Sequence, residues 1–207
     1  MWAGYWAPWI AHRAVALQWN GYELAEWSTR LPGVRDGSLG LGRLDFLAPL
    51  SAISLLTALA AYPAIADRPP AWLRWPAGLL ALLGAFAVLP EYPDILIAHA
   101  DAELRPRLIL GLATVLATAA ILVSRGRGLT RLPVLPRYFT AAARWILVAI
   151  ALGFTVRALV VVRPALAVIF DAAPRLNWGP VALLVGLCLV WAAELGASIA
   201  RTTARKR

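Results

Sequence analysis

The chain has 207 residues, of which 61% are hydrophobic and only 15% charged, and its net charge is +9. Soluble domains are roughly 45–50% apolar and about 25% charged, so a soluble domain of this length could not hide so much apolar surface. The composition therefore predicts an all-α, polytopic membrane protein that is embedded in the lipid bilayer. We expect the positive charge to set topology and to meet anionic head groups, and we do not expect nucleic-acid binding.

Cysteine and histidine, the side chains that most often bind transition metals or act as nucleophile and base, are scarce. The single cysteine, Cys188, excludes an intrachain disulfide and a thiolate metal cluster. The only histidines, His12 and His99, leave little room for a histidine metal site. No G-x-S-x-G motif, P-loop or dinucleotide fingerprint occurs. The sequence predicts no metal site and identifies no cofactor.

The first 30 residues mix tryptophan with polar groups. Trp2, Trp6 and Trp9 precede His12 and Arg13, and two further tryptophans follow before residue 30. A membrane span here would place His12 and Arg13 near the middle of the bilayer, which is costly. We therefore expect a Trp-rich helix that lies in the membrane interface, with a half-spanning helix as the alternative.

Charged residues continue through an outer segment that ends near residue 45. Glu23 and Glu26 are three residues apart and share one face of a helix. Arg43 and Asp45 close the segment. These four side chains are candidates for binding a ligand or a partner protein. The alternative is an amphipathic helix and a turn-rich loop in which Arg30 and Arg43 form salt bridges with the acids.

Five apolar segments come close to the roughly 20 residues that cross the hydrocarbon core of a membrane. Proline and glycine separate them, and tryptophans near their ends are typical of an aromatic belt. They predict a single membrane domain: an N-terminal interfacial helix and outer loop at 1–45, a five-helix bundle at 46–200 and a basic tail at 201–207. The predicted spans are 46–66, 73–90, 107–124, 141–162 and 178–200.

The loop after the second span places acids around a histidine: Glu91, Asp94, His99 and Asp101. A histidine with neighbouring carboxylates can bind a ligand or relay protons near neutral pH. His99 and Asp101 are only two residues apart, however, and would lie on different faces of a helix. The alternative is a solvated loop in which two acids offset two arginines: Asp101, Glu103, Arg105 and Arg107.

Arg157 and Glu194 are charged residues that lie well inside the last two predicted spans. A charge in lipid is costly unless it is paired, so both need partners. For Arg157 we expect an acid of the outer loops or an anionic substrate group. For Glu194 we expect Arg144 or Arg201 near the inner surface.

The distribution of charge predicts the orientation. Assigned to alternate loops, eleven of the twenty cations fall on one side and seven on the other, with Arg157 and Arg163 in or just after the fourth span. Cytoplasmic loops carry the excess of arginine and lysine. The C-terminus is therefore expected in the cytoplasm of a bacterial cell, with the chain a multi-pass protein of the inner (plasma) membrane. Nine of the eleven acids then lie on the outer side.

These features favour a non-catalytic membrane protein. We expect a small transport component, or an accessory subunit that binds a partner membrane protein or a second copy of itself. Its outer acids would line a capture site. The alternative is a membrane-embedded enzyme that uses a carboxylate and His99 as an acid–base pair at the outer surface.

Overall fold

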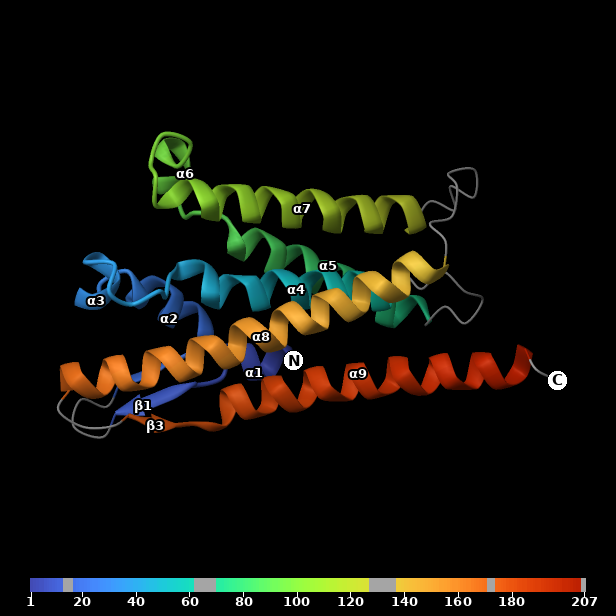
Figure 1. The fold of residues 1–207 in the computed structure, drawn as a ribbon. Helices are drawn as coiled ribbons and strands as arrows, with labels where there is room; N and C mark the ends of the chain where they lie inside the picture. Colours follow the sequence, from blue (N-terminus) through green and yellow to red (C-terminus); the bar gives the residue numbers. More distant parts are fainter. Residues whose placement is uncertain (13–16, 62–69, 127–136, 171–173, 206–207) are drawn as a thin grey trace.

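The chain folds mostly into long helices that run alternately in opposite directions (Figure 1). The structure, a computed structural model, describes residues 1–12, 17–61, 70–126, 137–170 and 174–205. Each predicted span corresponds to one long helix, although residues 62–66 of the first lie outside the described ranges. The long helices are α4 (Arg43–Ala61), α5 (Ala71–Val88), α7 (Leu104–Gly126), α8 (Arg137–Phe170) and α9 (Trp178–Arg205).

Among the described residues, four helices are long and apolar enough to cross a membrane: α4, α7, α8 and α9. The apolar part of α5, Trp72–Val88, is shorter. The helical fold is therefore confirmed, and four of the five predicted spans have the required length and hydropathy. α8 is much longer than the predicted segment 141–162, because its apolar helix continues through Pro164 to Phe170.

α4 is the central helix of the bundle. Of its apolar window, 78% is buried, against 22–28% for the corresponding windows of α7, α8 and α9. It packs against α5, α7 and α8, and it also contacts α2 (Gly21–Ser28). The core is consequently built around α4, while the outer helices expose large apolar side chains.

The N-terminal region differs from the prediction. Among residues 1–12 and 17–30, the chain forms two short helices and the two strands of a hairpin instead of the expected interfacial helix. The hairpin pairs with a third strand that precedes α9, which gives a small antiparallel sheet in the order β2-β1-β3. The elements are α1 (Trp2–Trp6), β1 (Ile10–His12), β2 (Leu17–Trp19) and β3 (Arg175–Leu176).

The residues around α1 enter the helix bundle. Tyr5 and Trp9 are fully buried, and α1 packs against α9. In Figure 1 the N-terminus lies near the middle of the bundle.

The bundle has two distinct ends. At one, here called the cap end, lie the sheet, α2, α3 (Pro32–Arg35) and α6 (Asp94–Ile97) (Figure 1). At the other, here called the tail end, α4, α7 and α9 finish and α5 and α8 begin. Eight of the nine predicted site residues belong to the cap-end segments or to the first turn of α4, and the ninth, Arg157, is on α8.

Candidate functional site

Arg107 connects three helices at the cap end: α2, α5 and its own helix α7. It lies in the first turns of α7, and its side chain is almost completely buried. Nε donates to the carbonyl oxygen of Val88 at 3.1 Å, Nη1 to Glu26 at 2.6 Å and Nη2 to the Tyr22 hydroxyl at 2.9 Å. The guanidinium also lies 5.8 Å from the centre of the Tyr22 ring, within the range of a cation–π contact.

Tyr22 and Glu26 extend this network. They are four residues apart on α2, so they share one face of the helix. Glu26 also pairs with Arg43 of α4 at 3.1 Å, and the Tyr22 hydroxyl donates to Glu91 at 2.7 Å. Burial, and next the hydrogen bond to Glu91, raise the pKa of Tyr22 to about 12. The five side chains, called the cap network below, join α2, α4, the loop after α5 and α7: Tyr22, Glu26, Arg43, Glu91 and Arg107.

A second ion pair joins α8 to the start of α4. Asp45 is buried, and its Oδ1 lies 3.3 Å from Nη1 of Arg157. Its other carboxylate oxygen accepts a hydrogen bond from the backbone N–H of Gly42 at 2.7 Å, close to the first turn of α4. Arg157 also donates to the carbonyl oxygen of Gly40. The expected acidic partner of Arg157 is thus Asp45.

The remaining predicted residues serve local structure or face solvent. Glu23 forms a capping box with Asn20 at the start of α2. Asp101 accepts backbone hydrogen bonds from Glu103 and Leu104 at 2.7 and 3.1 Å, and so caps α7. Asp94 and His99 are exposed, and neither side chain forms an ion pair or hydrogen bond with any described residue. Within the described ranges, no three His, Cys, Asp or Glu side chains gather into a group that could hold a metal ion.

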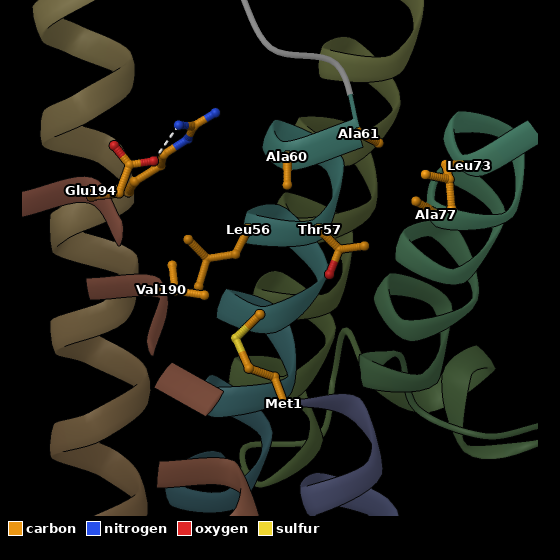
Figure 2. A pocket seen from close by; sticks show the side chains of 10 residues that line it. Met1, Leu56, Thr57, Ala60, Ala61, Leu73, Ala77, Val190 and Glu194 are labelled. Atoms are coloured by element: carbon orange, nitrogen blue, oxygen red, sulfur yellow. Dashed lines mark hydrogen bonds and ion pairs between the residues drawn. The ribbon is translucent and has the colours of Figure 1, made fainter. Parts of the chain in front are cut away.

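The structure also contains a cavity that the sequence did not predict. It lies toward the tail end, has a volume of about 490 Å³ and is called the ion-pair cavity below. Figure 2 shows Val190 and Glu194 of α9 on one side and Leu73 and Ala77 of α5 on the other, with Met1 below them. Its lining comprises Met1, Leu56, Thr57, Ala60, Ala61, Leu73, Ala77, Arg144, Val190 and Glu194.

Arg144 and Glu194 form an ion pair in the wall of this cavity (Figure 2). Both side chains are about four-fifths buried. Arg144 Nη2 also donates to the carbonyl oxygen of Leu59 at 3.0 Å, so the pair joins α8, α9 and α4. The predicted pairing of Glu194 with Arg144 is confirmed.

Tight packing seats α1 beside the ion-pair cavity. A Cβ added to Gly4 of α1 would overlap the backbone of Leu183, and one added to Gly186 of α9 would lie 2.7 Å from the backbone nitrogen of Met1. Trp2 Nε1 donates to the hydroxyl of Thr57, a lining residue, at 2.9 Å. α1 therefore lies in a slot between α4 and α9, which is wide enough only because positions 4 and 186 are glycine.

A second cavity of the same volume lies between α4, α7 and α8. Its walls are almost entirely alanine, leucine and isoleucine, with only Ser124 and Thr140 polar. It holds no charged lining residue. Its lining would suit an apolar molecule.

Sequence reasoning missed Arg107 as a functional candidate and treated it as an offset for Asp101 and Glu103. Its actual partners, Tyr22 and Glu26, lie more than 80 residues earlier in the chain. The available signal was the four-residue spacing of those two partners, which presents an acceptor pair on one face of α2.

Comparison with protein-family models, with curated proteins and with solved structures finds no match.

Proposed function

We propose that this chain is a non-catalytic transport component of the bacterial inner membrane, and that the ion-pair cavity is the space in which it handles its ligand. One observation carries the proposal: Arg144 and Glu194 face a cavity inside the bundle. Ionisable residues within membrane helices are expensive to bury, and they typically line the paths of substrates, ions or protons.

The proposal includes five membrane crossings. α5 begins beside the end of α4 at the tail end and finishes at the cap end, where α7 starts. Its apolar stretch of 17 residues extends about 26 Å at 1.5 Å per residue, near the lower limit for a membrane helix. Exposed Trp72 and Trp75 near its tail end suit an aromatic belt. A short but upright α5 therefore supports the fifth crossing.

Two further features support transport. Short, interrupted helices beside a ligand site are typical of transporters. The short helix α1 packs against the long helix α9, and Met1 just before it borders the cavity. The excess of cations at the tail end supports a cytoplasmic C-terminus, so the cavity would lie toward the cytoplasm.

The contacts among the cap-end residues argue against the open capture site that the sequence suggested. Glu26, Arg43, Asp45, Glu91 and Arg157 are paired with one another or with other cap residues. Their contacts support a rigid outer lid on the bundle rather than an open capture site. Asp94 and His99 remain exposed, and they are the predicted site residues best placed to meet a ligand or partner from the outer side.

Native mass spectrometry of the protein purified in mild detergent tests this function. We expect the wild type to carry a small molecule and Ala77→Phe to lose it, because the larger side chain fills the cavity. Ala113→Phe, on an exposed face of α7, is the matched control and should retain the molecule.

An empty wild type, or equal occupancy in both variants, would contradict the assignment of the ion-pair cavity. Recovery of the chain only in a stable complex with larger membrane proteins, with no bound small molecule, would instead identify an accessory subunit.

A further inference from the structure

The ion-pair cavity occupies the tail-end part of the space between α5 and α9. On α5 its lining residues are Leu73 and Ala77, in the first two turns after the tail end, and on α9 they are Val190 and Glu194. Met1, the residue before α1, forms the boundary of the cavity on the cap-end side (Figure 2). The N-terminal segment therefore lies between the cavity and the cap end of the bundle.

The first two residues of this segment contact three long helices. Trp2 Nε1 donates to the Thr57 hydroxyl of α4 at 2.9 Å, and a Cβ added to Gly84 of α5 would overlap the Trp2 ring. Met1 lies against Gly186 of α9, where an added Cβ would be 2.7 Å from the Met1 backbone nitrogen. Met1 and Trp2 consequently connect α5, α4 and α9 across the cap-end side of the cavity.

The rest of α1 is packed firmly behind these two residues. A Cβ added to Gly4 would overlap the backbone of Leu183 on α9. The Tyr5 side chain is fully buried, and its hydroxyl donates to the carbonyl oxygen of Phe46 on α4 at 3.0 Å. The segment therefore continues as a tightly packed barrier from the cavity toward the cap end.

The tail-end side of the cavity reaches the protein surface within the described ranges. Among the lining residues, Ala60 near the end of α4 and Leu73 near the start of α5 are exposed. Leu56, one turn nearer the cap end on α4, is buried. A ligand would thus enter the cavity from the tail end, and α1 blocks its passage toward the cap end.

We infer that Met1 and Trp2 form a plug that closes the ion-pair cavity toward the cap end, and that displacement of this plug opens a path from the cavity to the outer side of the membrane. The inference rests on the proposed transport function and specifies how the site is gated, because a transporter exposes its ligand site to the two sides of the membrane in turn. Bulky apolar constrictions keep water out of such paths. Trp2 seals the contact with α4 and α5 through its ring and one hydrogen bond, so a shift of α1 by the width of that ring breaks the seal.

Cysteine labelling tests the plug without a known ligand. Val190→Cys in a Cys188→Ser background places a thiol in the cavity wall, one turn beyond the contact of Gly186 with Met1. A membrane-impermeant methanethiosulfonate should label this protein in inside-out vesicles but not in intact spheroplasts. Adding Trp2→Ala should raise the rate of labelling from the outside about tenfold or more, because the ring and its hydrogen bond are lost.

Trp6→Ala is the matched control, because Trp6 belongs to the same short helix but is 43% exposed and does not line the cavity. It should keep Val190→Cys protected from the outside. Trp2→Phe, which retains a bulky ring, should restore most of the protection. Gly84→Ala, which leaves Trp2 in the chain but forces its ring away from α5, should increase outside labelling as Trp2→Ala does.

Outside labelling of Val190→Cys with an intact plug, or equal outside labelling of the monodisperse Trp2→Ala and Trp6→Ala proteins, would overturn the plug. If Trp2→Ala is not monodisperse, the same comparison is made with Gly84→Ala. Labelling from the inside would in those cases leave the transport proposal intact. A Val190→Cys protein that reacts from neither side in any of these variants would refute the ion-pair cavity as a ligand space, and with it both proposals.

Discussion

Arg105 and Arg107 lie two residues apart at the start of α7, yet only Arg107 is buried. Arg107→Gln should remove the charged hydrogen bonds to Glu26 and Tyr22 and lower the free energy of unfolding by about 2 kcal/mol. The loss stays moderate because Glu26 keeps its contact with Arg43. Thermal unfolding in detergent measures the difference.

Arg105→Gln is the matched control, since that side chain is exposed and its loss should change stability by less than about 0.5 kcal/mol. Equal shifts of the unfolding midpoint in the two variants would show that the cap network does not stabilise the fold.

The raised pKa of Tyr22 leads us to expect that the stability of the fold decreases at alkaline pH. Burial, with the hydrogen bond to Glu91, raises its pKa from the usual 10.0 to about 12, so the folded state favours the neutral phenol. This contribution is complete below pH 10.0 and is lost as the pH rises toward about 12. Melting curves of the wild type and Tyr22→Phe should therefore converge over that range. A constant difference between them would exclude the mechanism.

At the level of single residues, the sequence predicted that charges inside apolar spans would form ion pairs. Glu194 and Arg157 are charges in apolar helices, so the cost of burying them already required partners. Arg107 was missed because its partners come from a short helix whose position is set by the tertiary fold. The four-residue spacing of Tyr22 and Glu26 shows that they share a face of α2, but it does not show which residue that face meets.

The long helices were predictable, and the N-terminal hairpin was not. Apolar runs of helical length specify α4, α7, α8 and α9 locally, because each satisfies its own backbone hydrogen bonds. β1 has only three residues, and one of its neighbours is β3 at Arg175–Leu176. β1 pairs with a strand that lies more than 160 residues later in the chain, and it is too short to show a periodic pattern of apolar residues.

The close packing of α1 against α9 gives a prediction about the stability of this contact. Gly4→Ala should displace α1 from α9 and lower stability by about 1–3 kcal/mol, because the new methyl group overlaps the backbone of Leu183. Gly153→Ala in α8 has open space around the added carbon and should be neutral or stabilising by up to about 1 kcal/mol. Thermal unfolding compares them. Tolerance of alanine at Gly4 would argue against the close contact of α1 with α9.

For the whole molecule, the proposed orientation can be tested by labelling single cysteines in a Cys188→Ser background. His99→Cys, at the cap end, should react with a membrane-impermeant maleimide from the outside of intact spheroplasts. Arg131→Cys, between α7 and α8 in the chain, should react only after the membrane is opened. Labelling of both positions from the same side would refute five crossings.

The N-terminal segment also constrains how the molecule is assembled. Its neighbours are α9, the centrally placed α4 and the β3 strand just before α9. On the ribosome, residues 1–10 emerge well before α9, which supplies much of the surface that receives them. The slot between α4 and α9 can close only after translation has passed residue 186. This early segment thus reaches its final position late, and an insertase or chaperone that shields Trp2, Tyr5 and Trp9 would act during this interval.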